Sequence, residues 1–224
     1  MLILASSSPR RQQLLALSGW DFSIKPAEID ERPLPGEHPG DYTLRLAQMK
    51  ARSTAAQVPA DAVVVAADTT VADLEGLSGA EILGKPADAQ DARRMLVRLR
   101  GRVHHVYTAL AVYRRADEKL LSELCTTGVK MRNYSDAEIE EYIASGDPLD
   151  KAGAYAIQNS AFHPVEQWDG CYANVVGLPL CSLTRLLESF ELYPRRDIGR
   201  ELELALGYRC PIFTDQTGSG NFHN

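Results

Sequence analysis

The sequence predicts an α/β fold: a mixed, twisted β-sheet flanked by helices. Apolar, β-branched runs alternate with helical segments along most of the chain, and this alternation is typical of α/β proteins. One long hairpin, in which 103–113 and 120–131 are expected to pair antiparallel, interrupts the alternation, so the sheet is mixed. At 224 residues, and with roughly 150 residues in a typical domain, the chain is long enough for one large domain.

The chain begins with a strand, a polar turn and a helix. The apolar run at 2–5 stops at the turn SSSP, and the segment 10–17 is expected to be helical. Ser8 suits the N-cap because its hydroxyl can accept from a free backbone N–H. Pro9 suits the first helical position, where no N–H is needed.

The later elements follow from apolar periodicity and from capping signals. The run AVVVAA at 62–67 is apolar throughout, which is typical of a strand buried on both faces. SDAE at 135–138 is a capping box that opens a helix. The expected elements are a strand at 21–24, a helix at about 41–56, the strand at 62–67, a turn at 75–79, a helix at 88–99, the hairpin, a helix at 135–144, a strand near 173–176 and a helix at about 179–190.

The net charge of −6, from 24 Lys and Arg against 30 Asp and Glu, disfavours a general binder of polymeric nucleic acid or of an anionic membrane. The acidic surplus is uneven: 117–150 holds nine acidic and three basic residues, whereas 1–52 holds six acidic and seven basic ones. A small anion can therefore still bind in a local pocket of the N-terminal part.

No segment has the pattern of a secretory signal or of a membrane span. The cysteines, Cys125, Cys171, Cys181 and Cys210, show no CxxC spacing, which disfavours a metal cluster or a redox motif. We therefore expect reduced thiols and a cytoplasmic protein. The last stretch, 207–224, loses apolar periodicity and is expected to be a loose tail.

Two candidate sites carry cations at places where α/β sheets commonly bind ligands. The turn from Ser6 to Arg11 combines hydroxyls, a helix N-terminus and two arginines, all of which suit an anion. The alternative is a capped helix with solvated arginines. The turn Gly84-Lys85-Pro86 presents one ammonium, and the alternative there is an ordinary surface lysine.

Two further candidate sites carry carboxylates. Asp68 follows six apolar residues, so a rigid strand positions it, and it must end near solvent or a partner because an unpaired buried charge is unfavourable. The alternative is a structural cap on the next turn. Glu28, Asp30 and Glu31 lie together on a loop, with Lys50 on the helix that follows. Such a cluster can hold a hard divalent cation or form a solvated face.

His104 and His105 are adjacent in a predicted strand, so they are expected on opposite faces of the sheet. This placement disfavours a shared metal site and favours packing roles for both. The sequence also contains neither a nucleophile elbow nor a Walker loop.

Taken together, these segments resemble the Maf family of nucleoside triphosphate pyrophosphatases. The match runs in order from residue 2 to about residue 187, and an ordered set of motifs is far more specific than any one of them. The matching segments are SSSPRR at 6–11, Glu31, LAQMKA at 46–51, ADT at 67–69, GKP at 84–86 and DKAGAYAIQ at 150–158.

The resemblance implies hydrolysis of a nucleoside triphosphate to the monophosphate and pyrophosphate, with a divalent metal, Mg²⁺ or Mn²⁺, in nucleotide-pool sanitation. It implies a two-lobed α/β fold related to the inosine triphosphate pyrophosphatases, and usually a homodimer. Because the family normally ends near residue 190, we divide the chain into a pyrophosphatase domain at 1–194 and an extension of unknown role at 195–224.

The resemblance also implies a substrate branch. Arg10, Thr69 and Gln158 match the base-selective positions of the dTTP/UTP-specific branch. The 7-methyl-GTP branch places a large aromatic residue, a Gln and an acidic residue at those positions. The residues of this chain at all three base-selective positions therefore favour dTTP and UTP as substrates.

Catalytic and binding roles follow from the resemblance and from the chemistry of the side chains. Asp68 is expected to accept the proton of the attacking water and to bind metal, and Glu31 to be the second metal ligand. The expected phosphate-binding residues are Ser6, Arg11, Lys50 and Lys85.

Two other functions stay open at this point. The first is a pyrophosphatase for modified nucleotides. The second is a catalytically silent nucleotide-binding regulator of cell division, which the presence of Glu31, Lys50, Asp68 and Lys85 disfavours.

Overall fold

The computed structural model describes residues 1–74 and 81–210. Its centre is a mixed sheet of seven strands in the order β2-β1-β3-β5-β6-β7, with β4 paired to β3. The strands are β1 Leu2–Leu4, β2 Phe22–Ile24, β3 Val63–Asp73, β4 Glu81–Leu83, β5 Val103–Arg114, β6 Lys119–Met131 and β7 Val165–Asp169. The strand β1 is parallel to β2 and β3, and the other pairs are antiparallel, so the predicted mixed sheet is confirmed.

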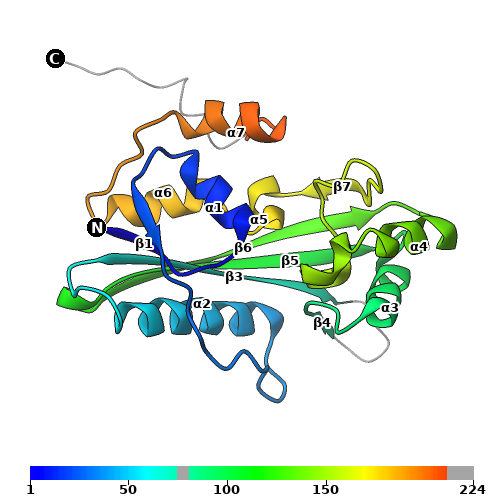
Figure 1. Ribbon diagram of the computed structural model, residues 1–224, viewed down its shortest axis with the longest axis horizontal. Coiled ribbons are helices and arrows are strands. Elements are labelled where there is room, and N and C mark those ends of the chain that lie inside the picture. The colour runs from blue at the N-terminus through cyan, green and yellow to red at the C-terminus, as the bar shows by residue number, and fades with distance from the viewer. Residues whose placement is uncertain (75–80, 211–224) are drawn as a thin grey trace.

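Helices cover both faces of the sheet, with α2 on one face and α1, α5 and α6 on the other; α7 lies outside α1 and α6 (Figure 1). The α-helices are α1 Pro9–Ala16, α2 Pro39–Ala55, α3 Ala89–Leu99, α4 Asp136–Ala144, α5 Tyr172–Val176, α6 Leu180–Glu188 and α7 Ile198–Leu206. Short 3₁₀ helices are formed by Arg115–Asp117, Asp147–Asp150 and Ala152–Ala154.

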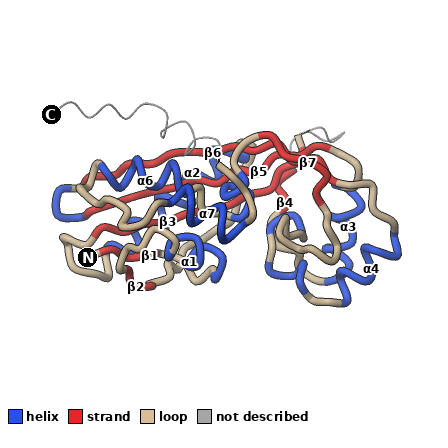
Figure 2. Tube along the Cα trace, turned by 90° about the horizontal axis from the view of Figure 1, so that it is seen from above, coloured by secondary structure: helices blue, strands red, loops and turns tan. Residues whose placement is uncertain are grey.

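The molecule has the expected two lobes. Figure 2 shows α3 and α4 gathered with β4 at one end of the long strands, apart from the helices at the other end. The smaller lobe has its own core, built around Leu96, Met131 and Ile139. In the larger lobe, Ala47, Ala51 and other small residues let α2 approach the sheet closely, while larger apolar side chains fill the opposite face.

Most predicted elements are present near their expected bounds. The long hairpin pairs from Val103 with Lys130 to Arg114 with Lys119. Ser135 and Glu138 form the predicted capping box. Ser8 takes the N-cap position of α1, but its hydroxyl makes no cap bond; its backbone N–H instead donates to Oγ of Ser6, at 3.2 Å.

The strand expected near 173–176 is wrong, because this segment is the helix α5. A short apolar run does not by itself distinguish a strand from one helical turn. Gly177 ends the helix with φ at 114°, and the amide of Asn174 donates to the carbonyl of Val106 and to Oγ1 of Thr127. These tertiary contacts select the helix.

Two elements were not anticipated, the edge strand β7 and the helix α7. The helix begins at an Asp197 N-cap and buries Ile198 and Leu202, one turn apart, against the core of the larger lobe. Cys210, in the stretch expected to be loose, is also buried. The predicted turn at 75–79 and the rest of the predicted tail, 211–224, lie outside the described residues.

Candidate active site

One cleft of about 500 Å³ between the two lobes is lined by all nine residues for which catalytic, metal-binding, phosphate-binding or base-selecting roles are expected. Glu28 and Asp30 of the candidate carboxylate cluster lie outside this lining, and Asp30 pairs with Arg32. The turn after β1 and the helix α2 contribute from the larger lobe, and the segment 150–158 contributes from the smaller one. The predicted residues in the lining are Ser6, Arg10, Arg11, Glu31, Lys50, Asp68, Thr69, Lys85 and Gln158.

A gap in strand pairing opens the cleft along β3. On that edge, β3 pairs with β1 as far as Val65 and with β4 only from Val71 onward. Asp68 therefore lies in the middle of a strand, not after its end as its sequence context predicts, and it pairs with Ala109 of β5 on the other edge. The chain leaves β1 for α1 at the gap, and the side chain of Asp68 projects from the face of the sheet toward Lys50 of α2.

Lys50 joins the two predicted carboxylates. Its Nζ lies 2.6 Å from Oδ1 of Asp68 and 2.8 Å from Oε1 of Glu31. The side chains of Lys50 and Asp68 are only 12% and 9% exposed, whereas that of Glu31 is 55% exposed. Charge pairing explains how Asp68 is tolerated in a buried strand, and Glu31 is the member with most room to move.

Arg11 is held on three sides. Its Nε donates to the carbonyl of Gly177 at 2.9 Å, and its terminal nitrogens donate to Oγ1 of Thr69 at 2.9 Å and to Oγ of Ser6 at 3.4 Å. Burial lowers the pKa of Arg11, while the charge of Asp68 acts in the opposite direction. The guanidinium has five N–H groups, so donors remain for an anion in the cleft.

Thr69 and Gly177 fix the position of this guanidinium. The hydroxyl of Thr69 is 3.0 Å from that of Thr108, which in turn donates to the carbonyl of Asn174. A Cβ on Gly177 would lie 3.2 Å from Oγ1 of Thr69, and its φ of 114° disfavours other residues. The backbone after α5 thus reaches Arg11 only because a glycine stands there.

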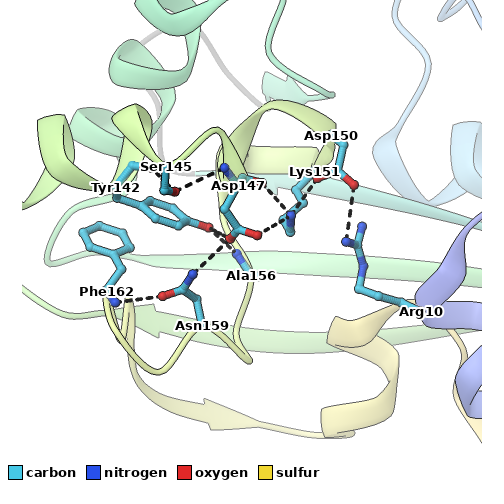
Figure 3. Close-up of polar contacts among 9 residues, drawn as sticks. All are labelled: Arg10, Tyr142, Ser145, Asp147, Asp150, Lys151, Ala156, Asn159 and Phe162. Atoms are coloured by element: carbon cyan, nitrogen blue, oxygen red, sulfur yellow. Dashed lines mark hydrogen bonds and ion pairs between the residues drawn. The ribbon is translucent and has the colours of Figure 1, made fainter.

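Arg10 connects the lobes, since its guanidinium lies 3.5 Å from Oδ2 of Asp150 (Figure 3). Asp150 also accepts from Lys151, whose Nζ donates in addition to Oδ1 and to the carbonyl oxygen of Asp147. An ammonium has three donors, so Lys151, although it lines the cleft, is fully engaged within its own lobe.

Lys85 and Gln158 are exposed at the cleft, and neither makes a hydrogen bond or ion pair with another residue of the described ranges. Their ammonium and amide groups are therefore available to a ligand.

Comparison with protein families confirms the resemblance that the sequence motifs suggested. The family model described as Maf-like protein matches residues 1–190. The chain belongs to the Maf family. It is 47% identical over 186 residues to a dTTP/UTP pyrophosphatase of Geobacter sp. (strain M21), covering 83% of this chain and 93% of that one. It is 51% identical over 188 residues to a dTTP/UTP pyrophosphatase of Anaeromyxobacter dehalogenans (strain 2CP-1), covering 83% and 92%.

Among solved structures, this Maf chain is similar to a HAM1 protein from Coxiella burnetii. The TM-score is 0.39, with 15% identity over 59% of this chain and 73% of that one. At this distance the likeness bears on neither substrate nor mechanism. No helix in the described part of the chain is long and apolar enough to cross a membrane.

The carboxylates of Glu31 and Asp68 are donors of the type that a magnesium-type ion takes. Oε1 of Glu31 and Oδ1 of Asp68 already share one cation, the ammonium of Lys50. Mg²⁺ is commonly held by one or two carboxylates together with substrate phosphates. No group of three or more Asp, Glu, His or Cys in the described ranges is arranged to hold a metal by protein ligands alone.

Sequence reasoning missed Tyr42, a further member of the cleft. Its hydroxyl donates to the carbonyl of Glu31 at 2.8 Å, and so restrains the loop that carries that carboxylate. Burial, together with the charges of Asp68 and Glu31, raises the pKa of Tyr42 to about 12. No spacing in the sequence marks this tyrosine, because its partner is a loop carbonyl.

Proposed function

We propose that this protein hydrolyses dTTP and UTP to the nucleoside monophosphate and pyrophosphate. The observation that carries the proposal is the carboxylate pair Asp68 and Glu31 sharing the ammonium of Lys50, in the same cleft as the guanidinium of Arg11. The relatives named dTTP/UTP pyrophosphatase support the choice of substrate. A cytoplasmic homodimer acting in nucleotide-pool sanitation belongs to the same proposal.

Asp68 is the proton acceptor in this proposal. One carboxylate oxygen is bound by Lys50 at 2.6 Å, which leaves the other for a water in the cleft. The water oxygen forms a bond to the α-phosphorus, its proton passes to Asp68, and the bond from that phosphorus to the bridging oxygen breaks so that pyrophosphate leaves. The strand β3 holds the carboxylate rigidly, and positioning of this kind lowers the barrier.

The cations of the cleft balance the charge of the triphosphate. Two of the three N–H donors of Lys50 bind Asp68 and Glu31, and the third can bind a phosphate oxygen. Arg11 supplies its remaining N–H groups, Lys85 reaches in from the opposite turn, and Ser6 lies where β1 ends. These fixed charges stabilise the pyrophosphate as its negative charge develops.

A divalent metal, Mg²⁺ or Mn²⁺, is part of the proposal. Glu31 and Asp68 would hold it, and when bound it would add positive charge beside the phosphates. Release of Glu31 from Lys50 would free its carboxylate for this purpose, and the exposure of that side chain allows the movement.

Base selection is assigned to the cleft between the lobes. The exposed amide of Gln158 can pair with the O4 and N3–H groups of uracil or thymine. A flipped amide would serve cytosine equally, so a donor-only group such as Arg10 is needed to disfavour the cytosine amino group. Thr69 belongs to this proposal through the family resemblance, and its hydroxyl accepts a hydrogen bond from Arg11.

A panel of nucleoside triphosphates, scored for pyrophosphate release with and without Mg²⁺ or Mn²⁺, tests the function. We expect dTTP and UTP to be cleaved fastest and only with metal. Faster cleavage of a modified nucleotide would favour a sanitising enzyme of different specificity. Nucleotide binding without cleavage in the presence of metal would favour the regulatory alternative.

Arg10→Ala tests base selection separately from catalysis. The ratio of UTP to CTP hydrolysis should fall, because the donor that opposes the cytosine amino group is removed. Asp150→Asn is the matched control, since it removes the partner of Arg10 and leaves the guanidinium in place. An unchanged ratio in Arg10→Ala would show that base selection lies elsewhere.

A further inference from the structure

Three cysteines that are far apart in the sequence line one small pocket on the outer side of the larger lobe. Cys171 is the N-cap of α5, Cys181 lies in α6, and Cys210 follows α7. Leu202 and Tyr208 complete much of the lining. The third thiol is specific to this chain's extension, because the Maf family match ends at residue 190.

The three thiols line the same pocket, and Cys181 lies beside both of the others. Cys181 and Cys210 are 6% and 5% exposed, and Cys171 is partly exposed. Cys171 is thus a partly exposed thiol, and the thiol of Cys181 beside it is buried.

Interaction with Cys181 lowers the pKa of Cys171, and interaction with Cys171 raises the pKa of Cys181. The thiolate is the reactive form of cysteine. Cys171, which is also the more exposed of the two, is therefore the thiol that attacks an oxidant most readily, with Cys181 beside it as a resolving thiol.

Cys125 provides a contrast within the same lobe. Its Sγ lies 3.3 Å from Oγ of Ser182, and burial raises the pKa of this thiol to about 11. Cys125 is not part of the pocket that the other three line.

We infer that Cys171 and Cys181 form an oxidisable dithiol that reacts with hydrogen peroxide. The thiolate of Cys171 attacks one peroxide oxygen, the O–O bond breaks, and the leaving hydroxide takes a proton to become water. The sulfenic acid formed on Cys171 is then attacked by the sulfur of Cys181. The S–O bond breaks, a second water leaves, and a disulfide remains; the two thiols have given two electrons to the peroxide.

The dithiol lies one short helix away from the cleft. The backbone N–H of Cys171 donates to Oγ1 of Thr127, which also binds the amide of Asn174 inside α5. The carbonyl of Gly177 at the other end of α5 accepts from Arg11. Oxidation therefore modifies the element that supports a residue of the cleft.

The test treats the reduced full-length protein with hydrogen peroxide and maps disulfides by mass spectrometry of proteolytic peptides, a readout independent of nucleotide hydrolysis. We expect a Cys171–Cys181 disulfide in the folded protein. Cys125→Ser should form it equally well. Cys181→Ser and Cys181→Ala should instead leave a Cys171 sulfenic acid that dimedone captures.

Three results would overturn the inference. These are Cys171 and Cys181 remaining thiols in the unsubstituted protein, a disulfide that joins Cys181 only to Cys210, and oxidation of Cys125 as fast as that of Cys171. Because the mapping on the unsubstituted chain needs no variant, the inference is tested even if a substitution prevents folding.

Discussion

At the scale of single residues, Asp68 and Lys50 form the buried centre of the cleft. Their charges compensate each other at 2.6 Å, and the two side chains are almost completely shielded from solvent. A change that keeps the shape of Asp68 but removes its charge therefore separates binding from proton transfer.

Asp68→Asn should retain nucleotide binding while kcat falls by about 10²–10⁴-fold, the usual contribution of a general base. Binding is measured by calorimetry and turnover by pyrophosphate release. Asp73→Asn is the matched control: it lies in the same strand, pairs with Arg98 and Arg102, and should lower stability without this loss of kcat. Near-normal turnover in Asp68→Asn would remove Asp68 from the mechanism.

His104 makes stability depend on pH. It is fully buried and hydrogen-bonded to the hydroxyl of Tyr155. Its pKa is lowered from 6.5 to about 3, and burial is the largest cause of this shift. Between these values the unfolded chain binds a proton that the folded protein does not. The free energy of unfolding should therefore decrease as the pH falls from 6.5 toward 3, by up to about 1.4 kcal/mol per pH unit.

Urea unfolding of His104→Gln across this range checks the prediction, because the variant should lose most of the pH dependence. Tyr155→Phe is the control, since it removes the hydrogen bond but keeps the imidazole buried, and should keep the dependence. Equal pH dependence in His104→Gln and the unsubstituted protein would contradict the assignment to His104.

The histidine pair also shows what residue patterns predict well. Alternation along a strand predicts opposite faces for His104 and His105, and the structure confirms it: the first is buried and the second is partly exposed. Tyr42, by contrast, acquires its position from a partner that no local pattern reveals, the backbone carbonyl of Glu31 in the preceding loop.

At the scale of elements, the 3₁₀ turn Ala152–Ala154 packs the smaller lobe's cleft segment onto β3. Gly153 has φ at 70°, and a Cβ there would lie 2.9 Å from Cγ1 of Val71. Its backbone N–H donates to the carbonyl of Gly84, next to Lys85. Backbone conformation and close approach both require glycine at this position.

Gly153→Ala should lower the free energy of unfolding by several kcal/mol, whereas Gly36→Ala should lower it by only about 1 kcal/mol. Gly36 is the matched control because its φ is 72° and no atom lies within 4 Å of the added Cβ. Denaturant unfolding gives the free energy of unfolding of both variants, and the difference between the two losses measures the clash of the added Cβ with Val71 alone. Equal losses would show that Val71 moves aside freely.

Elements with strong local signals are predictable, and weakly marked ones are not. The capping box of α4 and the apolar run of β3 carry their own signals, and both elements form. The segment 172–176 is ambiguous by periodicity, and contacts of Asn174 with β5 and β6 decide for a helix.

At the scale of the whole molecule, the segment after 190 is packed onto the Maf core. The indole N–H of Trp20 donates to the carbonyl of Tyr193, and the backbone of Arg195 and Arg196 binds the carbonyl of Ser18. The helix α7 then covers the core of the larger lobe with Ile198 and Leu202.

A chain ending at residue 194 should lose about 3 kcal/mol or more of its free energy of unfolding, because burial of each large aliphatic side chain contributes about 1.5–3 kcal/mol. A chain ending at residue 210 keeps α7 and should be more stable than the chain ending at residue 194. Denaturant unfolding of the three chains makes the comparison. Equal stability of the shortest chain would mean that α7 contributes nothing to the core.

The sequence by itself determined the family, the mixed sheet, most of its elements and nine of the residues that line the cleft. Those features depend on local periodicity, capping and ordered motifs, which are read along the chain. Only the tertiary structure decided that Asp68 lies within a strand, that Thr69 holds Arg11, that 172–176 is a helix and that three cysteines meet beneath α7. Each of these depends on a partner distant in sequence, and contacts of that kind are set by packing rather than by local pattern.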